Sequence, residues 1–183
     1  MKLRKFILAV GLLVLAGDAR GASRSVEELK TVYIERFTRF IEWPSNALPT
    51  AAPFVVCIQG TGGAAGDLGS MATSRQFKER ACEVRRVRPG SSLGGCHLLY
   101  IAPSEEPRLV QILSAVSGKP VLTVGDSQGF AERGVIINLF EESGYLRFDI
   151  NLSAVQSSPL KFSSRLLRLG RPVQERPVQP KPP

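Results

Sequence analysis

The side chains with the clearest chemical potential in this chain are three cysteines and one histidine. The cysteines are Cys57, Cys82 and Cys96, and the only histidine, His97, directly follows the last of them. A cysteine next to a histidine suggests a nucleophilic dyad, but neighbouring residues of a strand point to opposite faces of a sheet, so these two side chains should not meet. No Cys-x-x-Cys pair is present, which disfavours zinc or thioredoxin-like chemistry. We therefore expect no metal and no catalytic site, and a structural or rim position for His97.

A second feature with chemical potential is the glycine-rich stretch GTGGAAG at residues 60–66. It follows a predicted strand and precedes a predicted helix, which is the setting of a phosphate-binding loop. However, Arg88 and Pro89 stand where a dinucleotide-binding protein would carry an acidic residue, and no Gly-Lys-Ser/Thr is present. We expect a plain turn that binds no cofactor.

Polar residues also follow the predicted strand at 121–124. In open α/β sheets, the loops at the carboxyl ends of strands line the usual ligand crevice, so we expect three loops to share one rim: 60–66, 103–105 and 125–129. The candidate contacts for a partner or a ligand on this rim are Asp126, Ser127, Gln128 and Phe130. The simpler interpretation, which we favour, is that Asp126 caps a helix beginning at Ser127 or Gln128.

The elements that must position these residues follow from hydrophobic patterning. Continuous apolar runs predict buried strands, a weaker alternation predicts a more exposed one, and a Glu-Ser-Gly turn predicts a hairpin. The buried strands are expected at 54–58, 97–102 and 121–124, the exposed strand at 82–88, and the hairpin at 135–140 and 145–150.

Helical spacing of apolar residues predicts three further segments. The first helix is expected to start after Ser25, with Glu28 completing a capping box, and to continue to Pro44. A second helix begins at Pro103 and ends at Gly118, and a short one covers residues 163–169. Strands that alternate with helices predict an α/β fold, a three-layer sandwich around a mostly parallel sheet with a C-terminal antiparallel hairpin.

Both ends of the 183-residue chain differ in composition from this domain. Lys2, Arg4 and Lys5 precede an apolar run at 6–17 that is too short to span a bilayer. Small residues then follow, so residues 1–21 are predicted to be a cleaved signal peptide. Residues 22–170 are the expected domain, exported and not inserted in the membrane after cleavage. The proline-rich segment 171–183 is an expected disordered tail.

The formal charge of +8 includes basic residues in both of these end segments. The charge left on residues 22–170 is small and mixed in sign. Nucleic-acid binding needs Lys and Arg clustered on one face, so we expect no nucleic-acid partner.

Five blocks occur in a consistent order along the chain: YIERFTRFIEWP at 33–44, FVVCIQG at 54–60, CHLLYI at 96–101, PVLTVGDSQGFAERG at 120–134, and LRFDIN at 146–151 with LKFSSRLLRL at 160–169. Together they make the chain resemble the YfiR/HmsC-like family of periplasmic proteins (DUF4154). The resemblance implies a non-enzymatic, periplasmic regulator that binds the periplasmic region of a membrane-bound diguanylate cyclase and represses it, lowering cyclic di-GMP. A periplasmic small-ligand binding or sensor module is the alternative. The exposed side of the first helix, at Val32, Arg36 and Arg39, is a further candidate contact face.

Topology and this resemblance together predict a disulfide. Doubly wound sheets often place the first strand between the second and third, which would separate Cys82 from Cys96 by two strands, roughly 9–10 Å and too far for a bond. Cys57 would then neighbour both of them. Family members that carry a pair in these blocks place it at the positions of Cys57 and Cys96, so the resemblance implies a Cys57–Cys96 bond with Cys82 free.

Overall fold

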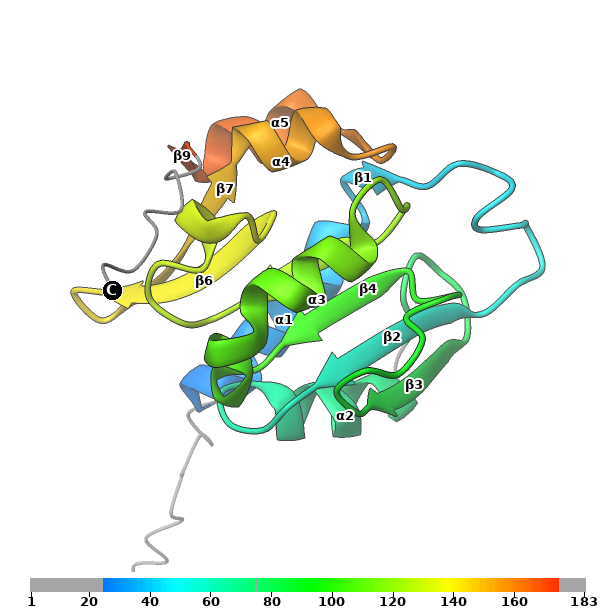
Figure 1. The fold of residues 1–183 in the computed structure, drawn as a ribbon, viewed down its shortest axis with the longest axis horizontal. Helices are drawn as coiled ribbons and strands as arrows, with labels where there is room; N and C mark the ends of the chain where they lie inside the picture. Colours follow the sequence, from blue (N-terminus) through cyan, green and yellow to red (C-terminus); the bar gives the residue numbers. More distant parts are fainter. Residues whose placement is uncertain (1–24, 75, 175–183) are drawn as a thin grey trace, which may run out of the picture.

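Within the described residues, seven strands form one sheet with helices on both of its faces (Figure 1). The computed structural model describes residues 25–74 and 76–174, so the expected signal peptide at 1–21 lies outside the described residues. The order of strands in the sheet is β3-β2-β4-β5-β6-β7-β9. The predicted α/β fold, with its mostly parallel sheet, is confirmed. The strands are β2 (Phe54–Gln59), β3 (Cys82–Val87), β4 (Leu98–Ile101), β5 (Leu122–Gly125), β6 (Ile137–Glu142), β7 (Tyr145–Asn151) and β9 (Arg171–Val173).

The strands from β3 to β6 are parallel to their neighbours, and the predicted hairpin adds β7 antiparallel to β6. Since β2 lies between β3 and β4, the direction of winding reverses at β2. Such a reversal opens a gap between loops that leave in opposite directions, which is the usual place for a ligand in this class of fold.

Helices cover the sheet from both sides. Alternation along β2 divides the core between them: Val56 and Ile58 pack towards α1 and α2, whereas Val55 and Cys57 pack towards α3. Figure 1 shows α3 in front of the sheet and α1 behind it. The helices are α1 (Val26–Thr38), α2 (Ala65–Ser74), α3 (Leu109–Val116), α4 (Leu152–Ser157) and α5 (Ser164–Leu169), with short 3₁₀ turns η1 (Pro103–Arg108) and η2 (Ala131–Arg133).

The first helix begins where expected and ends earlier. The Ser25 Oγ accepts a hydrogen bond from the Glu28 N–H at 3.0 Å, as a capping box requires. Helix α1 ends at Thr38, and the expected extension to Pro44 is wrong. Ile41 instead pairs with Phe162, in a small antiparallel sheet of β1 (Ile41–Glu42) and β8 (Lys161–Phe162). A partner about 120 residues away in sequence therefore overrides the local helical pattern.

The first residues of the expected tail are ordered, contrary to the prediction, and residues 175–183 lie outside the described residues. Residues Arg171–Val173 form β9, which pairs with β7 at the edge of the sheet, where Pro172 does not interrupt an inner ladder. The Arg171 guanidinium binds the Asp149 carboxylate through Nε–Oδ1 at 2.6 Å and Nη2–Oδ2 at 3.2 Å. It also lies 4.2 Å from the centre of the Phe140 ring. Specific side-chain contacts thus hold a segment whose composition predicts disorder.

Replacing Arg171 by glutamine should lower the free energy of unfolding by about 1–3 kcal/mol, because the Asp149 carboxylate would remain buried without its cation. The Asp149 side chain is only 5% exposed. Arg147→Gln is the matched control, since its Glu142 partner is half-exposed and such pairs contribute about 0.5 kcal/mol or less. Urea unfolding of both variants checks this, and equal losses would contradict it.

Candidate functional site

The loops that follow β2, β4 and β5 meet at the carboxyl end of the sheet, as expected, and together form the strand-end rim (residues 60–66, 103–105 and 125–129). The Thr61 N–H donates to Ser104 Oγ at 2.8 Å. The Ala64 N–H donates both to the Tyr100 hydroxyl oxygen at 2.8 Å and to Asp126 Oδ2 at 3.2 Å. The rim is therefore a set of loops bonded to one another.

Asp126 lies at the centre of these contacts rather than at a helix N-terminus. Its side chain is fully buried and accepts a hydrogen bond from Lys30 Nζ of α1 at 3.0 Å. The expected cap is wrong, because the chain turns after Gly125 and the next helical turn starts only at Ala131. A buried ammonium group and the Ala64 N–H offer this carboxylate stronger partners than a local amide would.

The charge state of this cluster depends on both its burial and its hydrogen bonds. Burial lowers the pKa of Lys30, but hydrogen bonds to Glu27 and Asp126 outweigh it, so the pKa of Lys30 is raised and the ammonium stays charged. Burial, followed by the Asp126 charge, raises the pKa of Tyr100 far above its ordinary value. Asp126 Oδ2 thus accepts from two fixed donors, Lys30 Nζ and the Ala64 N–H, an arrangement that stabilises the packing of α1 and the loops. Sequence reasoning missed Lys30, whose signal is a lysine four residues before the buried Ile34 on the apolar face of the helix.

The glycines of the loop allow this close packing. A Cβ atom on Gly60 would lie 2.6 Å from Ser104 Oγ, and one on Gly63 would lie 2.3 Å from Asp126 Oδ2. The loop at 60–66 therefore packs directly against the other two loops. Glu105 completes this wall: it accepts from Gln59 Nε2 at 3.2 Å and pairs with Arg108 at 2.8 Å, and the Arg108 hydrogen bond lowers its pKa.

The remaining candidate contacts lie in the turn after β5. Asn138 Nδ2 donates to the Ser127 carbonyl oxygen at 2.9 Å, which holds the turn against β6. Gln128 is exposed at its tip. Phe130 is fully buried in the core beneath α3, so it anchors the turn and is not on the rim surface. On the first helix, Val32 is likewise buried, while Arg36 and Arg39 are exposed.

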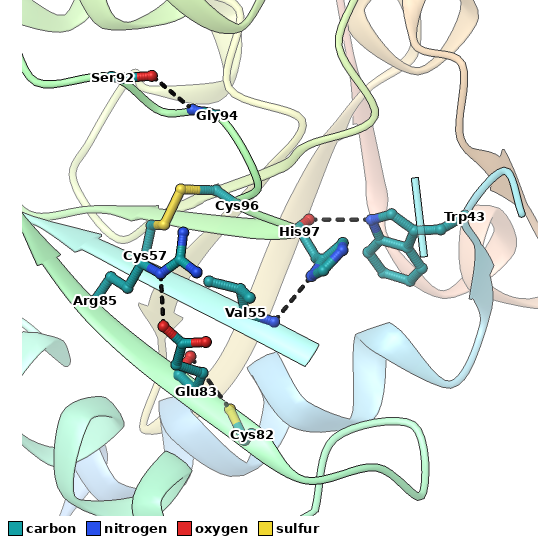
Figure 2. The surroundings of a disulfide bond; sticks show 10 residues. All are labelled: Trp43, Val55, Cys57, Cys82, Glu83, Arg85, Ser92, Gly94, Cys96 and His97. Carbon is teal, nitrogen blue, oxygen red and sulfur yellow. Dashed lines mark hydrogen bonds and ion pairs between the residues drawn. A yellow bond between two sulfur atoms is a disulfide. The ribbon is translucent and has the colours of Figure 1, made fainter. Parts of the chain in front are cut away.

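The structure joins Cys57 to Cys96, the pair that topology and resemblance predicted (Figure 2). Their Cα atoms are 5.7 Å apart, and both residues are buried on the α3 side of the sheet. Cys82 is free on β3 and packs on the opposite side, against the α1 and α2 core. Burial raises the pKa of the Cys82 thiol to about 12, so the thiol is protonated and is a poor nucleophile.

His97 has a structural position beside this disulfide (Figure 2). Its Nδ1 accepts the Val55 N–H at 2.9 Å, and its Nε2 lies 3.0 Å from the Ala47 carbonyl oxygen. The His97 carbonyl oxygen accepts from Trp43 Nε1 at 3.1 Å. The imidazole therefore links β2 to the segment after α1, with its Nε2 as the protonated nitrogen.

The stability of the domain should decrease in mild acid because of His97. Burial lowers its pKa from the ordinary 6.5, and an imidazolium could not accept the Val55 N–H. The contribution of neutral His97 to the free energy of unfolding is therefore present above pH 6.5 and is lost as the pH falls towards the lower pKa of the folded state. This loss is no more than about 1.4 kcal/mol per pH unit. His97→Asn keeps a hydrogen-bond acceptor but does not titrate. Between pH 7.5 and 5.5, roughly one unit either side of the ordinary histidine pKa, the free energy of unfolding of this variant, measured in urea, should therefore change less than that of the unmodified protein. The same slope in both proteins would contradict this role.

Two surface hollows lie away from the strand-end rim. One of about 510 Å³ lies between α3 and α4, and one of about 460 Å³ is lined by Tyr33, the β6–β7 hairpin and the end of α5. In the described part of the chain, no helix has the length and apolarity needed to cross a membrane. Over the same residues, His, Cys, Asp and Glu side chains do not gather in threes as a metal site requires.

Comparison with known proteins agrees with this fold and with the sequence blocks. A family model described as YfiR/HmsC-like (DUF4154) matches residues 27–171, from the first turn of α1 to the start of β9. No curated protein matches the chain significantly. The chain belongs to the YfiR/HmsC-like family, a family of periplasmic repressors of diguanylate cyclases that are generally non-catalytic regulators.

Proposed function

We propose that the mature domain is exported to the periplasm, binds the periplasmic region of an inner-membrane diguanylate cyclase and holds that enzyme inactive, which lowers cyclic di-GMP. The observation that carries this proposal is the family match over residues 27–171, nearly all of the described domain. The closed strand-end rim adds support. Its loops pack against one another, which favours contact between its outer surface and a protein over a small ligand held between the loops.

Inhibition across a membrane requires a difference in affinity. The domain must bind the inactive conformation of the cyclase more tightly than the active one. A roughly 100-fold preference corresponds to about 2.7 kcal/mol, which a few well-placed contacts can supply. A rigid contact surface helps, because little conformational entropy is lost when it binds.

We propose Ser127 and Gln128 as contacts on the strand-end rim. The turn that carries them is held on both sides, by Asp126 bound to Lys30 and by the buried Phe130. Gln128 is exposed at the tip of this turn. A partner would therefore meet a pre-organised loop there.

The test uses the purified mature domain and a full-length cyclase of this class reconstituted in vesicles with its periplasmic region outside. The domain should suppress cyclic di-GMP synthesis, and Gln128→Arg should weaken this at least about tenfold, equivalent to about 1.4 kcal/mol, without changing the melting temperature. The matched control is Gln111→Arg, on the exposed side of α3, which should inhibit normally. Failure of the unmodified domain to inhibit would contradict the proposed function, while equal inhibition by both variants would contradict only the contact.

A further inference from the structure

Helices α1 and α5 together form an arginine-rich surface, the α1–α5 surface, consisting of Arg36, Arg39, Phe40, Arg165, Arg168 and Leu169. Phe40 connects the two helices: its carbonyl oxygen accepts the Ser163 N–H at 2.9 Å, and its ring centre lies 5.8 Å from the Arg165 guanidinium carbon. Leu169 of α5 and Tyr33 of α1 line the same hollow, so the two helices also border one space. Residues from both ends of the domain sequence thus share one face.

Most arginines of this surface have no carboxylate partner, whereas most other described arginines form an ion pair. Arg36, Arg165 and Arg168 are exposed and form no ion pair with any described residue. Arg39 binds the buried Glu35 carboxylate at 2.8 Å, with its own side chain 65% exposed. By contrast, these arginines elsewhere in the domain form ion pairs with carboxylates: Arg85, Arg108, Arg133, Arg147 and Arg171. The α1–α5 surface therefore carries three guanidinium charges that no described carboxylate compensates. The other described arginines without an ion pair, Arg80, Arg86 and Arg88, lie at or beside β3, at the opposite edge of the sheet.

An exposed apolar side chain lies within this charge. Leu169 is 65% exposed and directly follows Arg168, and the Phe40 ring is half-buried beneath Arg165. Arginines around exposed apolar groups are typical of surfaces that bind at the interface of an anionic bilayer, where the apolar group enters the headgroup region. The guanidinium fork also matches phosphate oxygens.

We infer that the α1–α5 surface docks on the anionic lipid headgroups of a bilayer, without insertion of any helix. The arginines project from two helices on flexible side chains, which suits a fluid layer of phosphates better than a fixed acidic protein surface. The inference uses only the periplasmic location from the proposed function. Docking would hold the domain against the inner membrane. The domain would then diffuse in two dimensions as it searches for a membrane-embedded partner.

Binding of the exported, purified protein to cyclase-free vesicles tests this inference. The protein should sediment with phosphatidylcholine vesicles that contain phosphatidylglycerol, should not sediment with pure phosphatidylcholine, and should be released by salt. Arg165→Gln with Arg168→Gln should reduce binding about fivefold for each charge, on the order of 25-fold together. The matched control, Arg86→Gln with Arg88→Gln, removes the same charge from two exposed arginines that also lack an ion pair, at β3 and just after it, on the opposite edge of the sheet. It should bind almost normally.

Three results would overturn the inference: no binding to anionic vesicles, equal binding to both lipid compositions, or equal losses in the two double variants. A defect of Arg165→Gln with Arg168→Gln in cyclase inhibition, together with no lipid binding by the unmodified protein, would assign the surface to a protein partner instead. Because the vesicles contain no cyclase, failure of the proposed repression does not affect this result.

Discussion

Replacing Cys57 and Cys96 together by alanine is expected to lower the free energy of unfolding by roughly 3–4 kcal/mol. The bond joins residues separated by 39 positions, so its loss releases a long loop in the unfolded chain. The change also leaves two small gaps in the core beneath α3, where both residues are buried. Since domains of this size are commonly stable by only about 5–15 kcal/mol, such a loss is a large part of the total. Equilibrium unfolding in urea measures it.

Cys82→Ala is the control for this prediction. Cys82 is half-buried on the other side of the sheet and bonds to no other cysteine, so its replacement should cost about 1 kcal/mol or less. A reductant should destabilise the unmodified protein and leave the double variant unchanged. It should also weaken repression of the cyclase, if the folded domain is the inhibitor. Equal stability of the double variant and the unmodified protein would contradict a structural role for the bond.

Gly63→Ala is expected to destabilise the domain by about 2–4 kcal/mol. Gly63 has a φ of +53°, a left-handed conformation that costs an alanine about 1 kcal/mol, and its Cβ would lie 2.3 Å from Asp126 Oδ2 and 2.5 Å from the Tyr100 hydroxyl oxygen. The new methyl group would push the buried Asp126 carboxylate away from Lys30 and Ala64, and these partners would lose their acceptor.

The matched substitution three residues later should act in the opposite direction. Gly66 lies inside α2, and a Cβ atom there would meet no atom within 4 Å. Gly66→Ala should therefore stabilise the domain by about 0.5–1 kcal/mol, because alanine restricts the unfolded chain and favours the helix. Thermal unfolding of both variants distinguishes the two glycines. A Gly63→Ala protein as stable as the unmodified one would show that the loops of the strand-end rim do not need their close contact.

Patterns that depend on neighbours in sequence predicted the fold well. The apolar runs that became β2, β4 and β5 are buried at every position, and the hairpin formed around its Glu-Ser-Gly turn. The order β3-β2-β4 then placed Cys57 next to Cys96, where the resemblance had located the bond.

Features that depend on distant partners were not predictable in the same way. Helix α1 ends early because Ile41 pairs with Phe162, and β9 forms because the Arg171 guanidinium reaches Asp149. Asp126 was expected to cap a helix, yet its main partner is Lys30, 96 residues away in sequence. Local propensity does not report such contacts, because they arise only after the sheet has assembled.

Cyclic di-GMP in living cells tests the central claim most directly. The gene is deleted, and either the full-length protein or a copy lacking residues 1–21 is then expressed. The cellular amount of each of the two proteins is measured. Deletion should raise intracellular cyclic di-GMP, and only the copy with its signal peptide should return it to the original level, because the proposed contact lies in the periplasm. Unchanged cyclic di-GMP on deletion, or full restoration by the copy without residues 1–21, would contradict the account.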